Sequence, residues 1–167
     1  WLTSQPEPRA MRRFAYVLPS DHVFRNTGRP VLAVAPDGRS FVYNTTRGIF
    51  LRSMDELDAR LIPGTDEVLR GPFFSADGRS IGYFTQASQV KRIAISGGAP
   101  VVVGAHQGGA SIGAVWGSDG TILFGDAEGV YRVPATGGVP ELVVRSEGEN
   151  RMRSEEHTSE LQSLAYL

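Results

Sequence analysis

The chain has 167 residues, and its 17 basic and 18 acidic side chains leave a formal net charge of −1, so no electrostatic feature favours nucleic-acid binding. It contains no cysteine, which excludes disulfides and thiolate metal sites, and no apolar run of about 18 residues, the length a membrane-spanning helix needs. Twenty glycines, ten prolines and 41% apolar residues are typical of a turn-rich, all-β chain with a packed core.

The chain begins with a polar, proline-bearing stretch at residues 1–12, which we interpret as a linker. His22 lies in a polar loop after it, and His106 lies in a later glycine-rich loop. We expect both to be exposed loop residues, because neither has a second histidine or a carboxylate at ligand spacing.

Three copies of one pattern follow, in which an apolar run enters an Asp-Gly pair and a second apolar run leaves it. The copies span residues 34–43, 74–83 and 116–124, and their aspartates are Asp37, Asp77 and Asp119, spaced 40 and then 42 residues apart. Asp-Gly between apolar runs is a strong hairpin signal. A period near 40 residues is typical of propeller blades.

Two further apolar runs complete each period. The third runs lie at 48–52, 90–95 and 129–133, and the fourth at 59–62, 100–103 and 140–144. Gly-Gly turns at 96–100 and 136–140 separate them in the second and third copies. Four strands per period predict an all-β, incomplete β-propeller, with about three four-stranded antiparallel blades over residues 30–145. The side chains expected between blades are Phe41, Tyr43, Phe74, Ile81, Tyr83, Val115, Trp116, Ile122 and Phe124.

Several short motifs suggest chemistry that their context does not support. Gly109–Gly113 matches the G-x-S-x-G nucleophile elbow around Ser111, but an elbow needs a strand before the serine and a helix after it, whereas a strand is expected after this one. Asn44 begins a formal glycosylation acceptor at a strand end, which we attribute to chance, and Met54–Leu57 is expected to be a polar turn. We therefore predict no catalytic residue, no cofactor and no metal site.

Residues 146–167 are expected to be a non-native tail. The segment 153–163 resembles, residue for residue, the translation of a common DNA-sequencing adapter. His157, although it has Glu155, Glu156 and Glu160 nearby, is set aside with this tail. The native sequence is expected to end near residue 152.

The repeats resemble those of TolB-like β-propellers, a group with WD-like repeats. Their amino-acid sequence is most similar to that of the C-terminal propeller of bacterial membrane-anchored serine/threonine protein kinases. The resemblance rests on the segments 63–65, 70–79, 113–122 and 130–138. It implies that residues 13–29 form an opening strand, at 13–19, and a loop. It also implies a sensor or protein-interaction module outside the cytoplasm, in a membrane-anchored parent.

Two alternatives stay open: the propeller of a serine peptidase of the prolyl oligopeptidase or dipeptidyl peptidase type, and a free-standing periplasmic scaffold similar to TolB. No kinase motif occurs in the sequence, so the expected role is non-catalytic, with a protein or peptide partner. Such partners usually bind at one mouth of a propeller, where the loops 63–70, 105–112, 45–48 and 126–129 are expected. None of these loops concentrates charge or aromatic residues, so the sequence identifies no ligand-binding residue.

Overall fold

The computed structural model describes residues 14–25, 28–105 and 112–146, and within them the regular structure is all β. Three antiparallel four-stranded sheets follow one another along the chain, in the orders β1-β2-β3-β4, β5-β6-β7-β8 and β9-β10-β11-β12. Their strands are β1 (Leu32–Val34), β2 (Ser40–Thr45), β3 (Gly48–Ser53), β4 (Arg60–Leu61), β5 (Leu69–Phe74), β6 (Ser80–Thr85), β7 (Gln89–Ala94), β8 (Val101–Ala105), β9 (Gly113–Trp116), β10 (Thr121–Gly125), β11 (Gly129–Pro134) and β12 (Glu141–Arg145).

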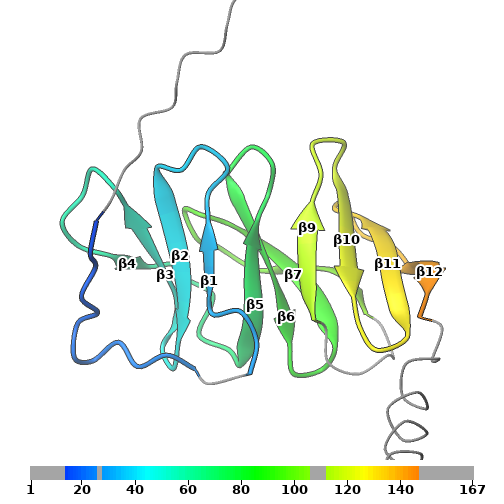
Figure 1. Cartoon of the computed structure of the whole chain (residues 1–167), viewed down its shortest axis with the longest axis horizontal. Coiled ribbons are helices and arrows are strands. Elements are labelled where there is room, and N and C mark those ends of the chain that lie inside the picture. Colours follow the sequence, from blue (N-terminus) through cyan, green and yellow to red (C-terminus); the bar gives the residue numbers. More distant parts are fainter. Residues whose placement is uncertain (1–13, 26–27, 106–111, 147–167) are drawn as a thin grey trace, which may run out of the picture.

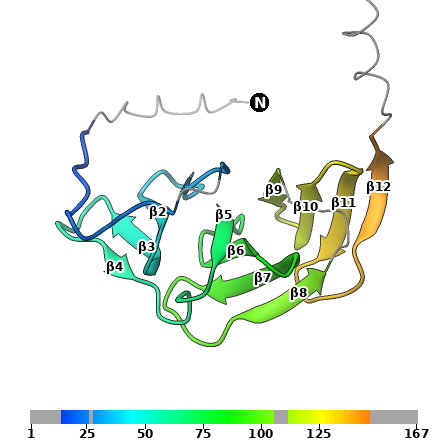
Figure 2. The ribbon, with the colours of Figure 1, turned by 90° about the horizontal axis from the view of Figure 1, so that it is seen from below.

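The three sheets are arranged as consecutive blades of an arc (Figures 1 and 2). The first strands β1, β5 and β9 lie on the concave side, and the fourth strands β4, β8 and β12 lie at the outer rim. The prediction of an incomplete propeller with three four-stranded antiparallel blades is confirmed.

Each blade begins with a hairpin that is closed by an Asp-Gly turn, as predicted. The aspartate side chain accepts a hydrogen bond from the backbone N–H two residues later, at 2.8 Å in blade 1, 3.0 Å in blade 2 and 2.9 Å in blade 3. The glycines Gly38, Gly78 and Gly120 have φ of +68°, +71° and +78°, a conformation that disfavours a side chain. The same two residues therefore build the same turn three times.

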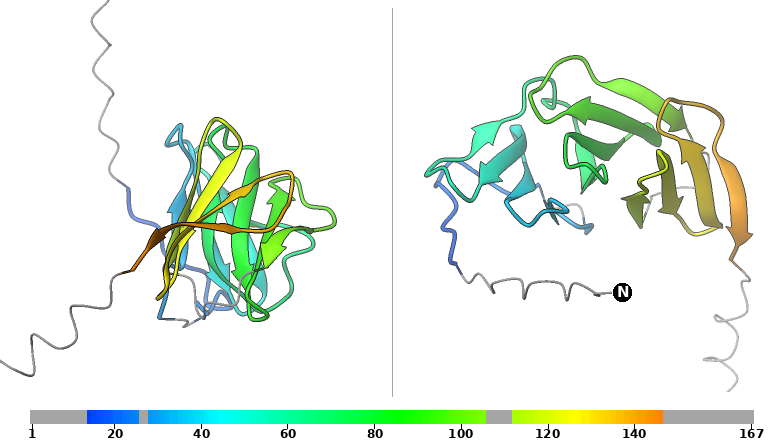
Figure 3. Two further views of the ribbon diagram at one scale, coloured as in Figure 1. Left: turned by 90° about the vertical axis from the view of Figure 1, so that its right-hand side faces the viewer. Right: turned by 90° about the horizontal axis from the view of Figure 1, so that it is seen from above.

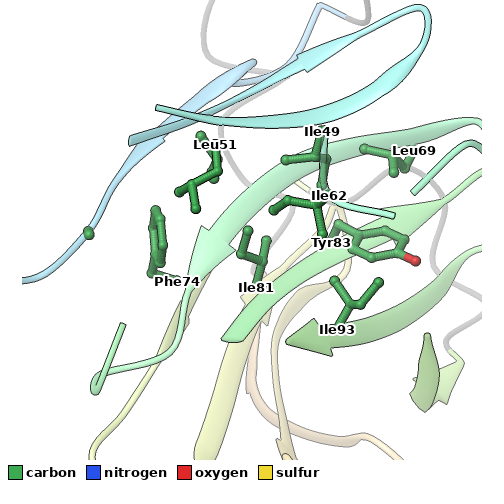
Figure 4. Close-up of a cluster of buried hydrophobic side chains, with 10 residues drawn as sticks. Ile49, Leu51, Ile62, Leu69, Phe74, Ile81, Tyr83 and Ile93 are labelled. Carbon is green, nitrogen blue, oxygen red and sulfur yellow. The ribbon is translucent and has the colours of Figure 1, made fainter. Parts of the chain in front are cut away.

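A buried apolar cluster joins blades 1 and 2 (Figure 4). Blade 1 contributes Val42, Ile49, Leu51 and Ile62, and blade 2 contributes Leu69, Phe74, Ile81, Tyr83 and Ile93. Because side chains alternate between the two faces of a strand, β6 directs Ile81 and Tyr83 toward blade 1 and Phe84 toward blade 3.

A second cluster joins blades 2 and 3 and is richer in aromatic rings. Phe73 and Phe84 of blade 2 meet Phe124 and Trp116 of blade 3, with ring centroids 5.8 Å apart for Phe84 and Phe124 and 6.4 Å apart for Phe73 and Trp116. The expected burial of Val115 is wrong: its side chain is 62% exposed, because it faces away from blade 2, and Trp116 is only half-buried.

The Gly-Gly turns connect neighbouring blades at the outer rim. The N–H of Gly98 donates to the Pro63 carbonyl of blade 1 at 3.2 Å, and the N–H of Gly138 donates to the Val103 carbonyl of blade 2 at 2.9 Å. A Cβ on Gly97 would lie 2.6 Å from the Pro63 ring, so only glycine fits there. Each of these turns thus fastens its blade to the preceding one.

The segment Phe14–Phe24, which we call the strap, lies against the outward face of blade 1 (Figure 3). The strand expected at 13–19 is not formed at residues 14–19. The physical reason is that the strap packs on the face of a sheet, where backbone groups find no ladder to join; its only bridge in the described residues pairs Phe24 with Thr45. Tyr16 and Leu18 instead pack on the cluster of Phe41, Tyr43 and Phe50.

Candidate functional site

The connections at one end of the blades, the mouth end, are held by buried polar side chains. This end carries the β2–β3, β6–β7 and β10–β11 turns and the β4–β5 connection. Thr65 in that connection accepts the N–H of Ile49 at 2.9 Å and donates to the Ile62 carbonyl at 2.8 Å. Asn44, which is fully buried, donates to the Leu69 carbonyl of blade 2 at 2.9 Å. Its burial agrees with the interpretation of the Asn44 acceptor motif as chance.

An ion-pair cluster lies between the β4–β5 connection and blade 2. Glu67 receives hydrogen bonds from the Tyr83 hydroxyl at 2.8 Å and from Lys91 at 2.8 and 2.9 Å. Burial, and then the Glu67 carboxylate, raise the pKa of Tyr83 well above its ordinary value, so the hydroxyl stays a donor. The cluster connects a mouth loop to two strands and serves the architecture of the blade.

In the matching turn of blade 3, polar side chains also form hydrogen bonds within the blade. Asp126 accepts the N–H groups of Glu128 at 2.8 Å and Gly129 at 3.3 Å. The hydroxyl of Tyr131 donates to Glu128 at 2.8 Å, which together with burial raises the pKa of Tyr131 to about 12. These carboxylates are therefore used in closing the β10–β11 turn.

The best candidate site is a groove on the concave side, which we call the inner groove. It has a volume of about 400 Å³ and runs across the first strands of all three blades. Its lining is almost entirely apolar: Pro30, Leu32, Ala33, Val34, Pro36, Gly71, Pro72, Phe73, Phe74, Ala76, Gly113, Ala114, Val115 and Trp116. Leu32, Val34 and Val115 are exposed in it, which makes the surface available to a partner.

A β-bulge shapes the middle of the inner groove. The β5–β6 pairing shifts between Arg70 and Phe73, so Gly71 and Pro72 stand outside the regular ladder. Gly71 has φ of +57°, which a side chain disfavours, and Pro72 has no N–H to pair. Bulges are frequent beside binding sites because they redirect the strand there. The sequence signal was the Arg-Gly-Pro-Phe segment, which does not alternate as a regular strand would.

The other residues that the sequence singled out fall outside this groove. His22 is not an exposed loop residue, which corrects that expectation: it is half-buried, its Nδ1 lies 2.8 Å from the Tyr43 hydroxyl, and its ring centroid lies 3.9 Å from that of Phe50. The physical reason is that the strap folds back onto the aromatic face of blade 1. His106, Ser111 and His157 lie outside the described residues. Met54–Leu57 is a turn, as predicted.

Residues 14–25, 28–105 and 112–146 contain no helix of the length and hydropathy that crossing a bilayer requires. In the same ranges, no group of three or more histidine, aspartate or glutamate side chains is placed to hold a metal ion.

No protein-family model matches the chain, and no curated protein matches it. Solved structures do: a putative TolB from Agrobacterium tumefaciens has a TM-score of 0.54 and 21% identity, over 65% of this chain and 46% of that one. TolB from Acinetobacter baumannii has a TM-score of 0.57 and 20% identity, over 69% and 32%. Hydrazine synthase from Kuenenia stuttgartiensis has a TM-score of 0.59 and 10% identity, over 79% and 40%.

The chain therefore spans less than half the length of each of these solved proteins. Identities of this size show the fold alone, and the names include an enzyme as well as TolB, so the fold does not choose a function. Three blades, built by one repeated hairpin and joined face to face, give this chain the fold of a TolB-type β-propeller.

Proposed function

We propose that this chain is a non-catalytic binding or sensing module that takes a protein or peptide partner in the inner groove. The observation that carries the proposal is the groove itself, because it is concave, apolar and built from the first strands of all three blades. Small sites of this kind bind apolar side chains and use a few backbone groups for orientation. An extended peptide segment with apolar or proline residues is the partner that best matches this lining.

The charged side chains at the mouth end stabilise the blades, which supports a binding site elsewhere, in the inner groove. Glu67 is bound by Tyr83 and Lys91, and Asp126 accepts two backbone N–H groups. The charge of Glu67 is paired with Lys91, and the Asp126 carboxylate accepts hydrogen bonds from the backbone of its own turn, so both groups serve the structure of the blades. Recognition in the inner groove then depends on shape and apolar contact.

The parent protein is proposed to be a bacterial serine/threonine kinase that is anchored in the membrane and carries this propeller outside the cytoplasm. Support comes from the resemblance of the segments 70–79 and 113–122 to such propellers. A free-standing TolB-like scaffold is the second candidate, and the likeness to two solved TolB structures favours it. Sequencing the uninterrupted locus separates the two: a kinase domain and a membrane span upstream are expected, and a signal peptide directly before Trp1 would contradict the kinase proposal.

Binding is tested with a library of random peptides displayed on phage and selected on the full chain. We expect selected peptides to share an apolar or proline core, and Trp116→Leu to weaken binding about tenfold, a loss of about 1.4 kcal/mol. Val139→Ser is the matched control, because Val139 is 91% exposed at the outer rim. Peptides that bind the Trp116→Leu variant as tightly as the parent, or a failure to select any, would contradict a site in the inner groove.

A further inference from the structure

A second cavity opens beside the inner groove, between the Asp-Gly turns of blades 2 and 3, at the end of the blades opposite the mouth end (Figure 1). We call it the turn pocket. It has a volume of about 370 Å³ and is lined by Ser75, Ala76, Asp77 and Ser80 of blade 2 and by Trp116, Gly117, Ser118 and Gly120 of blade 3. Ala76 and Trp116 also line the inner groove, so the two cavities are adjacent.

A single difference between two equivalent turns accounts for this opening. Between blades 1 and 2, the ring of Pro36 reaches toward blade 2, and its Cδ lies 3.8 Å from the Cβ position of Gly78. The next turn has Ala76 in place of that proline. Apart from its chain neighbours, no described residue lies within 4 Å of the Cβ position of Gly120. The space that proline fills at the first interface is therefore open at the second.

The turn pocket combines one carboxylate with one aromatic ring. Oδ1 of Asp77 accepts the Ser75 hydroxyl at 2.6 Å and the N–H of Arg79 at 3.0 Å, which leaves Oδ2 without a hydrogen bond among the described residues. The Ser75 hydroxyl holds the pKa of Asp77 below its usual value, so the carboxylate is charged at neutral pH. The Arg79 side chain is exposed and does not line the pocket, whereas the Trp116 ring is half-buried in its wall.

We propose that the turn pocket binds the guanidinium group of an arginine, in the peptide whose apolar part lies in the inner groove. A guanidinium stacks on an indole ring such as that of Trp116, and its planar fork of N–H groups donates to a carboxylate such as that of Asp77. Ser80 and Ser118 add hydroxyl oxygens that accept further N–H groups. A negatively charged side chain would be repelled by Asp77. The peptide part of this inference rests on the proposed function, but the pocket can be tested with a free ligand.

The pocket alone is tested by titrating the full chain with N-acetyl-arginine amide, and with N-acetyl-citrulline amide as a neutral ligand of the same shape. NMR follows the indole N–H of Trp116, whose signal is identified with the Trp116→Leu variant. We expect saturable shifts with the arginine ligand in the millimolar range and weaker binding of the citrulline ligand. Asp77→Asn keeps an oxygen acceptor for the turn and should weaken the arginine ligand about three- to fivefold while leaving the citrulline ligand unchanged. Asp37→Asn removes the same charge from the equivalent turn of blade 1 and should change neither.

A second variant, Ala76→Pro, copies the turn of blade 1 and narrows the pocket. The N–H of Gly78 donates to the Ser75 carbonyl at 2.9 Å, as the N–H of Gly38 does to the Ala35 carbonyl, so the two turns are closed alike. Proline is favoured at the second position of such a turn, and the fold should be kept, which far-UV circular dichroism checks. The variant should lose the preference for the arginine ligand over the citrulline ligand.

The peptide part is tested with peptides that are selected on the parent chain. An arginine should recur beside their apolar core, and its replacement by citrulline should weaken binding to the parent about three- to fivefold but not to Asp77→Asn. Selected peptides that need Trp116 but no arginine would overturn the inference and leave the proposed function standing. An arginine ligand that shifts no signal, or that binds Asp77→Asn as tightly as the parent, would also overturn it. If no peptide is selected, the proposed function fails, and the titration still decides whether the pocket binds a guanidinium group.

Discussion

A glycine in the middle of β6 offers a sharp test of how the blades pack. Gly82 lies opposite Phe73 in the β5–β6 register, and the Phe73 ring lies over it. A Cβ on Gly82 would lie 2.8 Å from Cε1 of Phe73 and nearer still to Cζ and Cε2. The ring has little room to move, because Phe84 and Trp116 are beside it, with ring centroids 5.9 and 6.4 Å away. Gly82→Ala should therefore overpack the interface between blades 2 and 3.

The expected cost follows from two opposing effects. Overpacking a core costs about 1–3 kcal/mol, whereas replacing a strand glycine by alanine returns about 0.5–1 kcal/mol of backbone entropy. The free energy of unfolding should fall by about 1–2 kcal/mol, which corresponds to roughly 2–8 °C in Tm for a chain of this size. Gly113→Ala is the control: nothing lies within 4 Å of its Cβ position and its φ is not left-handed, so stability should stay or rise.

Blade 1 suggests the compensating change. At the same register position it pairs Ala33 with Val42, a small residue on the first strand and a larger one on the second. Phe73→Ala alone should cost about 3–5 kcal/mol, but Phe73→Ala with Gly82→Val should cost at least about 1 kcal/mol less than the sum of the two single changes. Urea unfolding at one fixed protein concentration, followed by circular dichroism, measures all variants. Additivity within about 0.5 kcal/mol would refute the idea that these two positions share one volume.

Two further predictions concern hydrogen-bonded side chains. Tyr83→Phe removes the donor to Glu67 while keeping the ring, and should lower the free energy of unfolding by about 1–2 kcal/mol in urea titrations; an unchanged midpoint would show that Lys91 alone satisfies the carboxylate. The Ser75 hydroxyl, 2.6 Å away, holds the pKa of Asp77 below its usual value, so the stability it contributes is present above the unfolded pKa and is lost as pH falls through the folded pKa. Tm measured from roughly pH 5 to pH 2 should fall less steeply for Asp77→Asn than for the parent, and identical acid profiles would contradict this.

The sequence was sufficient for the blades because their turns are local. An Asp-Gly pair closes its hairpin through a bond that spans two residues, so the positions of Asp37, Asp77 and Asp119 needed no knowledge of the rest of the fold. Alternation along β2, β6 and β10 then placed the six expected side chains of these strands inside, and of the three expected on β5 and β9 only Val115 is exposed.

The failures concern contacts between distant segments. Val115 has the pattern of a buried strand residue, but its side chain points to the face of blade 3 that is turned away from blade 2, and among the described residues no further blade covers that face. His22 and the strap pack on Tyr43 and Phe50, which follow His22 by 21 and 28 residues, and the composition of the loop does not predict so distant a contact. The inner groove was missed for the same reason, since its lining comes from all three blades and each segment alone resembles ordinary core.

The Gly-Gly turns have a consequence for how such a chain folds and grows. The N–H groups of Gly98 and Gly138 donate to the carbonyls of Pro63 and Val103 in the preceding blade, so blades 2 and 3 each carry their own attachment to the blade before them. Because each of these bonds closes a loop of only about one period, the entropic cost of closing it is small. Each blade can therefore dock on the preceding blade in turn, starting from the N-terminal side. A duplicated copy of blade 2 or blade 3 would therefore carry the glycine turn that attaches it to the preceding blade. A duplicated copy of blade 1 would lack this attachment, because its corresponding turn at 54–58 contains no glycine.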